Sequence, residues 1–490
     1  MLAGLASAAV VLGFDPTSDS WVTESHAKPG KPPHGPPHHG TLRGIPRLDG
    51  HIETDPAALV PFSTDLGNAV YRTPVAVLFP GSVKDIQEMV RFCKKNRISV
   101  AARGQGHTTS GQGLAKSGLV INMSSLNTIH SISSKKAVVD AGVTWKDLVT
   151  ETVNYGLTPP GLTGYTKLSI GGTLSVGGVT PLKNNAGAQV DNVRELTVVT
   201  GTGALKVCSK QKDRDLFEGM LGGLGQYGII VRAVLDLVPA RSLSRTYLIN
   251  YSDNATFFSD LRKLLNRGEL DGMYNLWVPD GAGGYTYQLN AVKHFEAGHP
   301  PNDTHLLRGL SHDSLQVIDE SYLSTMLRVD VQIEYLRSLG LFDNMKHPWF
   351  DVFLPDETIE EYVDEVLPAL TPEDVGPFGF MLLLVLKRSE LKRPLFRVPN
   401  NTKWVYLFDI LTSSATPTPD ADYDARMLAR NRDLFEKARA MGGTRYPIGS
   451  LDFSHADWRA HQGDQYARFA RLKKKMDPSG ILTPGPGIYC

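Results

Sequence analysis

Residues 103–113 have the sequence RGQGHTTSGQG, and this glycine-rich loop is the stretch that decides the fold. It comes directly after a predicted strand–helix–strand unit, in which buried strands at Val75–Phe79 and Ile98–Ala102 flank a helix. Ser82 stands where that helix needs an N-cap, and apolar side chains follow it at helical spacing. Because turns alone also demand glycine, a single loop of this kind does not yet define a binding site.

Two more glycine-rich loops follow, GLTGYTKLSIGGTLSVGG at 161–178 and GGLGQYG at 222–228. Paired glycines expose several backbone N–H groups with no side chain in the way, which suits a ligand with phosphates and a long polar body. The first loop also carries His107, whose imidazole stands on a backbone that can approach a flat ring. The three loops together therefore predict one cofactor site.

The third loop contains the GxGxxG dinucleotide fingerprint as a bare string. A Rossmann site needs a strand before the glycines and a helix after them, so that the pyrophosphate meets a helix N-terminus. The predicted order here is the reverse, with a helix at Asp213–Met220 and a strand at Ile229–Val238. The sequence thus argues against a nicotinamide-type Rossmann site.

Length and composition exclude several classes of protein. A chain of 490 residues predicts two or three domains. The 51 Lys and Arg residues are balanced by 51 Asp and Glu residues, which argues against a nucleic-acid partner, and a hydrophobic content of 41% argues against bulk disorder. Cys93, Cys208 and Cys490 are too few and too far apart for a disulfide framework or a zinc site, and we expect no metal.

The N-terminal residues 1–14, MLAGLASAAVVLGF, are about as long as the hydrophobic region of a signal peptide and too short to span a bilayer. No basic residue precedes them, so we interpret them as the remnant of an export signal and expect a secreted or extracytoplasmic protein without a membrane span. A frayed apolar terminus is the alternative. The segment HAKPGKPPHGPPHHG at 26–40 predicts an extended linker rather than a metal site.

After residue 240 the pattern changes to longer amphipathic helices and fewer paired glycines, which predicts a second domain. The predicted helices are Ala255–Asn266, Asp356–Leu367 and Tyr423–Ala440, and the predicted strands include Val329–Glu334, Asp351–Leu354 and Trp404–Thr412.

Five motifs in order make residues 60–490 resemble the FAD-linked oxidases of the para-cresol methylhydroxylase and vanillyl-alcohol oxidase superfamily and, within it, the cytokinin dehydrogenases. The motifs are ARGQGHT at 102–108 with Gly111-Gln112, GGTLS at 171–175, LGGLGQYGII at 221–230, HPW at 347–349 before VFLP at 352–355, and MDP at 476–478 with ILTPG at 481–485.

The resemblance implies an α+β fold with a two-part FAD-binding domain of the para-cresol methylhydroxylase type. On this basis residues 1–53 are the export-signal remnant and linker, and 54–240 form the FAD-binding domain. Residues 241–444 form a substrate domain, an antiparallel sheet with flanking helices, and 445–490 complete the FAD-binding domain.

The resemblance also implies the cofactor site. In the family, the histidine of the GxGH loop is bonded covalently to the 8α-methyl carbon of the flavin, and His107 stands at that position. Related berberine-bridge-type oxidases attach the flavin a second time through a cysteine that would fall near Tyr165, where this chain has none, so we expect a single link. The residues expected to bind FAD are Gly104, Gln105, Gly106, His107, Thr108, Gln112, Gly164, Ser169, Ser175, Val179, Ile230, Tyr446 and Thr483.

Three departures from the family concern the substrate. Cytokinin dehydrogenases carry an aspartate that accepts a hydrogen bond from the substrate amine, and this chain has Gly164 there. A family glutamate near the channel mouth falls at Tyr274 or Asn275, and a glutamine beside the flavin is Pro486. The scaffold for the flavin is kept, whereas the carboxylate that handles the amine is missing.

Another group must then act as the base, or the reaction needs none. Tyr165 is the nearest candidate, because a phenol held by a cation such as Lys167 can assist proton removal. The alternatives are that its ring packs on the flavin and that Lys167 is simply solvated. Asp343 and Asp409 are further candidates from the substrate domain. The residues expected either to line an aromatic substrate slot or to belong to the core are Trp349, Trp404 and Tyr406.

The predicted function is hydride transfer from a C–N or C–O bond of a small organic substrate to covalently bound FAD, followed by reoxidation with dioxygen or a quinone. Because the family aspartate is Gly164, the same chemistry on an alcohol, a sugar or a secondary metabolite is an alternative. A flavin-binding protein that has lost catalysis is another. The sequence leaves the oligomeric state open.

Overall fold

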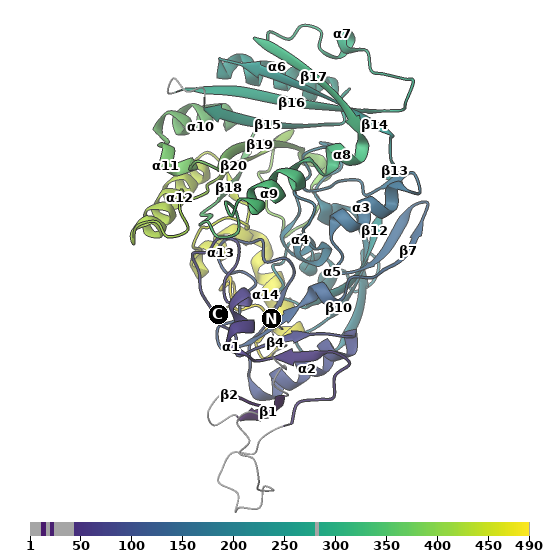
Figure 1. Ribbon diagram of the computed structural model, residues 1–490, viewed down its shortest axis with the longest axis vertical. Helices are drawn as coiled ribbons and strands as arrows, with labels where there is room; N and C mark the ends of the chain where they lie inside the picture. Colours follow the sequence, from purple (N-terminus) through teal and green to yellow (C-terminus); the bar gives the residue numbers. More distant parts are fainter. Residues whose placement is uncertain (1–10, 16–19, 24–43, 280–283, 490) are drawn as a thin grey trace, which may run out of the picture.

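The computed structural model of the protein describes residues 11–15, 20–23, 44–279 and 284–489 (Figure 1). Residues 1–10 of the predicted export signal, the whole linker at 26–40 and Cys490 lie outside these ranges. Within them, β1 (Val11–Asp15) and β2 (Ser20–Thr23) form an antiparallel hairpin. Phe14 packs edge-on against Trp21, and Trp21 stacks on Phe92 of α2 (Val83–Asn96), so this hairpin covers one face of that helix.

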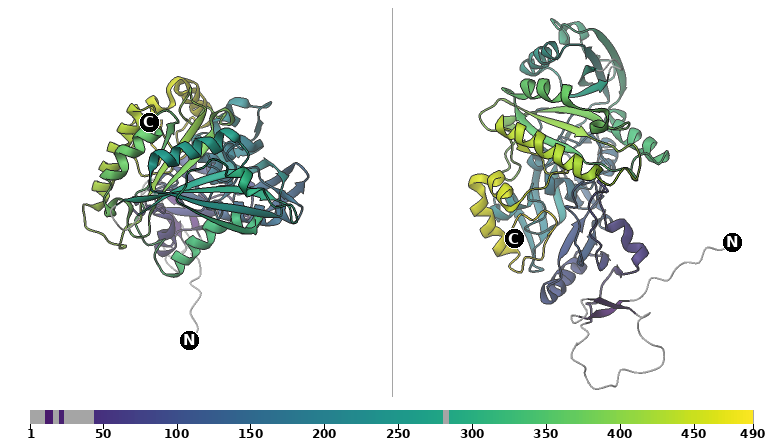
Figure 2. Two further views of the ribbon diagram at one scale, coloured as in Figure 1. Left: turned by 90° about the horizontal axis from the view of Figure 1, so that it is seen from above. Right: turned by 90° about the vertical axis from the view of Figure 1, so that its left-hand side faces the viewer.

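The ordered chain forms two lobes that follow one another along the long axis of the molecule (Figure 1). The first lobe contains residues 44–240 and 446–489, and the second lobe contains residues 241–445, including the last strand of its sheet. In the right-hand view of Figure 2 the yellow C-terminal helices lie beside the purple and blue part of the ribbon, which belongs to the first lobe. The first lobe is therefore formed by two chain segments, one before and one after the second lobe in the sequence.

The first lobe contains two main sheets. A four-stranded sheet has the order β3-β4-β6-β5, in which β6 pairs in parallel with β4 and β5, and a five-stranded antiparallel sheet has the order β11-β10-β12-β8-β7. Their strands are β3 (His51–Glu53), β4 (Ala76–Phe79), β5 (Val100–Arg103), β6 (Leu119–Asn122), β7 (Ile129–Ser133), β8 (Lys136–Asp140), β10 (Val193–Val199), β11 (Leu205–Ser209) and β12 (Ile229–Asp236). The remaining elements are α1 (Pro56–Leu59), α2, α3 (Trp145–Val153), α4 (Ile170–Val176), α5 (Arg214–Met220), α13 (His455–Gln462), α14 (Tyr466–Met476) and the short pair β9 (Leu157–Thr158) and β13 (Val238–Pro239).

The elements around the glycine-rich loops agree with the sequence. The Ser82 side chain caps α2 by accepting a hydrogen bond from the Asp85 N–H, and the first loop begins at the end of β5. The loop at 222–228 lies between α5 and β12, so a helix precedes it and a strand follows it. The predicted order of elements around this loop is thus confirmed, and it is the reverse of the order that a Rossmann site needs.

The second lobe is built on an eight-stranded antiparallel sheet with the order β17-β14-β16-β15-β19-β20-β18-β21. Its strands are β14 (Leu243–Tyr251), β15 (Gly272–Pro279), β16 (Tyr285–Phe295), β17 (Ser314–Ser321), β18 (Phe350–Pro355), β19 (Phe380–Lys387), β20 (Trp404–Leu411) and β21 (Thr444–Arg445). Its helices are α6 (Asn254–Arg267), α7 (Asp303–Leu306), α8 (Tyr322–Met326), α9 (Arg328–Ser338), α10 (Ile359–Val366), α11 (Pro372–Val375) and α12 (Tyr423–Ala440). The predicted α+β fold is confirmed.

The two faces of this large sheet have different partners. Phe350, Val352 and Leu354 of β18 point into a core shared with α6, α10 and α12. Successive strand residues face opposite sides, so Asp351 and Phe353 point the other way, toward the first lobe. The sheet therefore contributes one face to its own core and the other to the space between the lobes.

The predicted strand at Val329–Glu334 is wrong, because these residues lie within helix α9. Val329, Val331 and Ile333 alternate with polar residues, which imitates the two-residue period of a strand. In the helix, Ile333 packs toward Trp349 between the lobes whereas Val331 is exposed. Tertiary packing of the inner face decides the conformation here.

The C-terminal segment completes the sheet of the first lobe. The Val100 N–H of β5 donates to the Ile481 carbonyl at 2.7 Å, and the Thr483 N–H donates to the Val100 carbonyl at 2.8 Å. Asp477 is buried and ion-paired with Lys473 at 2.9 Å, and its carboxylate also accepts the N–H groups of Ile481 and Leu482. One carboxylate thus fixes the turn that returns the chain to β5.

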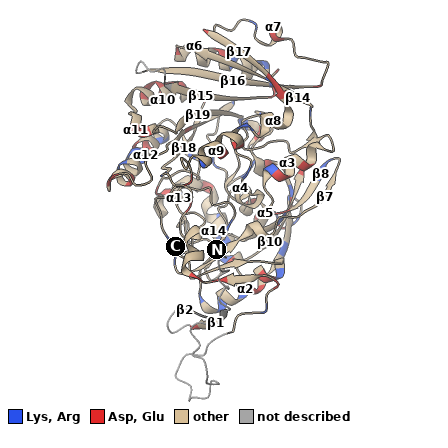
Figure 3. Ribbon diagram, in the orientation of Figure 1, with Lys and Arg blue, Asp and Glu red and all other residues tan. Residues whose placement is uncertain are grey.

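Neither sign of charge gathers on the face shown in Figure 3. Within the described ranges, no group of three or more His, Cys, Asp or Glu side chains is arranged to hold a metal ion. None of the helices in the described part of the chain has the length and apolarity needed to cross a bilayer.

We expect Asp477→Ala to lower the free energy of unfolding by about 3–5 kcal/mol, because it leaves the buried Lys473 ammonium uncompensated and two backbone N–H groups without an acceptor. Denaturant unfolding followed by fluorescence measures this change. Asp464→Ala is the matched control, since the Asp464 side chain is 75% exposed and its ion pair with Arg397 is long, at 3.6 Å. Equal losses in the two variants would contradict this role for Asp477.

Candidate active site

A cavity of about 900 Å³ lies between the two lobes. One wall consists of the three glycine-rich loops and residues next to them, and the other wall is the inner face of the large sheet with α9. Cavities of this size hold cofactors and small ligands. The cavity therefore lies where main-chain groups from one lobe face side chains from the other.

The first glycine-rich loop is held by a buried carboxylate that the sequence analysis missed. Oδ2 of Asp65 accepts the Gly111 N–H at 2.6 Å and the Thr108 hydroxyl at 2.9 Å. Oδ1 has no partner among the described residues, and burial raises the pKa of Asp65 to about 6. Two positions in the second half of the loop are thereby tied to the same side chain.

The loops approach one another too closely for side chains at some glycines. A Cβ on Gly104 would lie 2.0 Å from the Ser169 hydroxyl, and a Cβ on Gly171 would lie 2.8 Å from the Ala141 methyl carbon. The Thr483 hydroxyl donates to the Gly225 carbonyl at 3.0 Å, which joins the C-terminal segment to the third loop. Stretches of bare main chain on this wall fit a long ligand with a flat ring and phosphates.

The structure places all residues expected to bind the cofactor on the wall of this one cavity. They are Gly104, Gln105, Gly106, His107, Thr108, Gln112, Gly164, Ser169, Ser175, Val179, Ile230, Tyr446 and Thr483.

His107 lies among aromatic rings at the junction of the lobes. Its ring centroid is 4.9 Å from that of Tyr165, 5.4 Å from that of Trp349 and 6.3 Å from that of Phe342. Burial, together with the nearby Arg337 cation, lowers the pKa of His107 to about 3. The imidazole is therefore neutral at physiological pH and keeps one unprotonated nitrogen.

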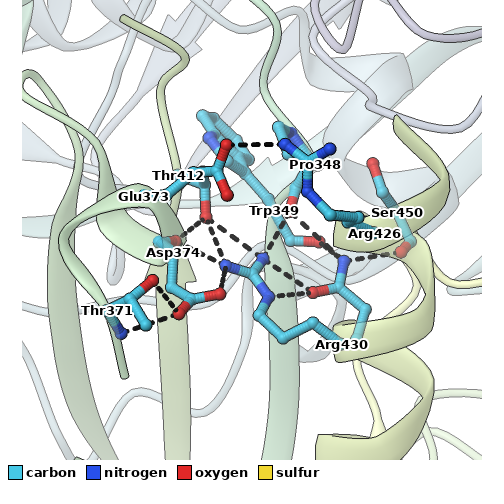
Figure 4. Close-up of polar contacts among 10 residues, drawn as sticks. Pro348, Trp349, Thr371, Glu373, Asp374, Thr412, Arg426, Arg430 and Ser450 are labelled. Atoms are coloured by element: carbon cyan, nitrogen blue, oxygen red, sulfur yellow. Dashed lines mark hydrogen bonds and ion pairs between the residues drawn. The ribbon is translucent and has the colours of Figure 1, made fainter. Parts of the chain in front are cut away.

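Helix α12 fixes the segment that carries Trp349 (Figure 4). Arg430 donates to the Pro348 carbonyl at 3.0 Å, and the Asn431 amide donates to the carbonyls of Trp349 and Ser450 at 3.1 and 2.7 Å. These buried carbonyls need donors, and the two adjacent helix residues supply them. The ring of Trp349 is thus held in place beside His107.

The cation on Tyr165 is Arg337, not Lys167. Nη1 of Arg337 donates to the Tyr165 hydroxyl at 2.5 Å, whereas Lys167 pairs with Glu334 at 2.8 Å. Burial raises the pKa of Tyr165 more than Arg337 lowers it, so the phenol stays protonated at neutral pH. Asp343 pairs with Arg337 at 3.0 Å, but it is exposed and lies outside the cavity wall.

The remaining candidates separate into wall and core. Trp349 and Asp409 lie on the cavity wall, whereas Trp404 and Tyr406 belong to the core on the other face of the sheet. The predicted substrate-mouth positions also differ from each other: the Tyr274 hydroxyl faces the cavity and accepts from Arg328 at 2.7 Å, while Asn275 is buried in the sheet and donates to the Leu383 carbonyl. Pro486 is not on the wall, and its carbonyl accepts from the Trp458 indole.

Gly164 lies on the wall with free space in front of it. A Cβ there would meet nothing nearer than Val329 at 3.7 Å and Pro181 at 3.9 Å, which are ordinary contacts. The backbone at this position does not require glycine, since its φ is not in the left-handed region. Gly164 therefore leaves room for a side chain that the chain does not have.

The fold and the cavity define the class of FAD-linked oxidoreductases of the para-cresol methylhydroxylase type. The family described as FAD binding domain matches residues 74–209, and the family described as Cytokinin dehydrogenase 1, FAD and cytokinin binding, matches residues 272–489. The crystal structure of 6-hydroxy-D-nicotine oxidase from Arthrobacter nicotinovorans is similar in fold, with a TM-score of 0.71 at 20% identity, over 89% of this chain and 96% of that one.

Sequence relatives identify the family within this class. The uncharacterized oxidoreductase ORF5 in the fasciation locus of Rhodococcoides fascians is 35% identical over 89% of this chain and 99% of its own length. Cytokinin dehydrogenase 1 of Oryza sativa subsp. japonica is 31% identical over 90% of this chain and 92% of its own length. Cytokinin dehydrogenase 1 of Arabidopsis thaliana is 31% identical over 90% of this chain and 83% of its own length. The chain belongs to the cytokinin dehydrogenase family of FAD-dependent oxidoreductases.

We expect Asp65→Asn to change how stability depends on pH. The folded pKa of about 6 lies above the ordinary value of 3.8, so the stabilisation from the protonated carboxyl is full below pH 3.8 and is lost as the pH rises through 6. The wild type should therefore lose about 3 kcal/mol relative to the variant across this window, since each tenfold change in an acid constant is worth ~1.4 kcal/mol.

Unfolding measured from pH 4 to 7 tests this. The amide oxygen that Asp65→Asn introduces can still accept from Gly111 and Thr108, so the variant should fold. Asp433→Asn, at an exposed position of α12, should follow the wild type. A difference between wild type and Asp65→Asn that is constant over this range would show that Asp65 titrates normally.

Proposed function

We propose that this oxidoreductase oxidises a C–N bond of a small amine of the cytokinin type and that its FAD is bonded to His107. The observation that carries the proposal is the neutral imidazole of His107 on the cavity wall, between the first glycine-rich loop and the aromatic rings of the second lobe. When bound, FAD supplies the acceptor for two electrons from the substrate carbon and passes them to dioxygen or a quinone.

The chain's own residues position the reactants and exclude water. The glycine-rich loops present main chain to the cofactor, and Asp65 holds the loop that carries His107. A neutral imidazole keeps a ring nitrogen available for the covalent bond. Trp349 and Phe342 cover the cavity around that ring and reduce the space for water.

A single covalent link is proposed. Cys93 and Cys208 are both buried and free, and the second glycine-rich loop, at 161–178, contains no cysteine. Burial raises the pKa of both thiols, which keeps them in the unreactive protonated form.

An alcohol, a sugar or a secondary metabolite is the second candidate substrate, and Gly164 is the observation that favours it. The side chain that would accept a hydrogen bond from an amine is absent at this position. Anaerobic mixing with isopentenyladenine separates the two candidates. Loss of flavin absorbance supports the amine, whereas bleaching only by alcohols or sugars supports the alternative.

We expect His107→Ala to release its flavin on acid precipitation, whereas the wild type keeps the flavin in the protein pellet. The visible spectrum of pellet and supernatant measures this directly. His130→Ala is the matched control, because His130 pairs with Asp140 on the five-stranded sheet and is not on the cavity wall. Flavin that stays fixed to His107→Ala would refute the assignment.

We expect Gly164→Asp to fold with a melting temperature close to that of the wild type, because the new Cβ makes only ordinary contacts. If the cavity binds isopentenyladenine, the added carboxylate should accelerate anaerobic flavin bleaching by up to about 100-fold, the lower range for a general base. Gly164→Asn controls for the added volume. Equal rates in the two variants would mean that a carboxylate at this position has no role.

A further inference from the structure

Two carboxyl groups meet on the cavity wall contributed by the large sheet. Asp351 of β18 and Asp409 of β20 are directly opposite each other in the antiparallel register. Each is only 3% exposed, and both line the cavity. On the other side of Asp409 its opposite residue is Leu382 of β19, so the pair lies in an otherwise apolar part of the sheet.

These carboxyl groups lack the partners that buried acids normally have. Apart from the contact between the two carboxyl groups themselves, both oxygens of Asp351 and Oδ1 of Asp409 accept no hydrogen bond from the described residues. The charge of Arg445 acts on Asp351, but the hydrogen bond from its Nη2 goes to the Gly449 carbonyl at 3.3 Å; the Tyr446 phenol also lies within the field of the pair. Two unpaired carboxylates cannot both remain ionised in such a site, because desolvation and mutual repulsion oppose the second charge.

Burial raises the pKa of Asp351, and burial together with the neighbouring Asp351 raises the pKa of Asp409 well above its ordinary value. The two groups therefore titrate as a pair. A proton retained between the two carboxyl groups leaves the pair with a single negative charge.

Glu320 and Tyr165, two other ionisable residues on the wall, already have cationic partners. Glu320 forms an ion pair with Arg328, and the Tyr165 phenol accepts from Arg337 and stays protonated. Gly164 supplies no carboxylate. Among the described residues, Asp351 and Asp409 are thus the acids on this wall that form no ion pair.

We propose that Asp351 and Asp409 share one proton and together accept the proton of the substrate's nitrogen, in place of the aspartate missing at Gly164. This inference rests on the proposed function and narrows its substrate class to amines with an N–H group next to the oxidised carbon.

The step balances with the FAD named above as the oxidant. Oxidation of CH–NH to C=N removes two protons and two electrons. The hydrogen on carbon leaves with both electrons of its bond to FAD, and the hydrogen on nitrogen leaves as a proton to the carboxyl pair. The electrons of the N–H bond form the second bond of C=N, and the pair changes from one shared proton and one negative charge to two protons and no charge.

A first experiment needs no substrate. Infrared spectra of the holoenzyme, titrated with acid and base, should show the carbonyl stretch of a protonated carboxyl at neutral pH. This band should persist in Asp433→Asn and disappear in the double variant Asp351→Asn/Asp409→Asn. Its absence from the wild type, or its persistence in the double variant, overturns the shared proton.

A second experiment tests the role in catalysis. Wild type, Asp351→Asn, Asp409→Asn and Asp433→Asn are mixed anaerobically with isopentenyladenine, a simple secondary amine and the matching alcohol. Amines should bleach the wild type and Asp433→Asn at equal rates and each single pair variant about 10²–10⁴-fold more slowly, the usual range for loss of a general base. The wild-type rate should fall at acidic pH, because the carboxyl pair becomes fully protonated there. In the pair variants this pH profile of the bleaching rate should differ from that of the wild type.

Wild-type rates in the pair variants, or a wild type that alcohols bleach and amines do not, overturn the proposal. If one single variant fails to fold, the other still decides the question. If no compound bleaches the wild type, amine oxidation fails as the proposed function, while the infrared titration still confirms or overturns the carboxyl pair by itself.

Discussion

The cavity depends on how closely the main chains of the glycine-rich loops can approach one another. Gly104 and Ser169 lie so near that a Cβ on the glycine would be 2.0 Å from the serine hydroxyl, and Gly171 is similarly confined against Ala141. Side chains at these positions would separate the loops and fill the wall. Because they are absent, main-chain groups line one side of a cavity of about 900 Å³, and the Asp65 carboxylate keeps the first loop in that position.

The opposite wall follows from the two-residue period of the large sheet. In β18, Phe350 and Val352 stabilise the core beneath the helices, while Asp351 between them faces the cavity. One face of this strand thus packs in the hydrophobic core of the second lobe, and the other face presents a carboxyl group to the cavity. A one-residue shift in register would exchange the two sets and place acids in the hydrophobic core.

Features encoded within one short segment were the ones that could be predicted from the sequence. The loop around His107 was recognisable because its glycines, its preceding strand and its helix are contiguous. Asp65, Arg337 and the pairing of Asp351 with Asp409 depend on segments far apart in the sequence, and no local pattern marks them. At Val329–Glu334 a local pattern gave a wrong prediction. Its alternating β-branched residues suggested a strand, whereas packing of Ile333 between the lobes favours a helix.

The hydrogen bonds between β5 and the C-terminal segment have a consequence for the order in which the protein folds during its synthesis. The Val100 N–H is satisfied by the Ile481 carbonyl, and the third glycine-rich loop is bonded to Thr483. During translation the early strands of the first lobe emerge long before these partners, and the entire second lobe must be made in between. The wall of the cavity is therefore complete only after the last residues of the chain have left the ribosome.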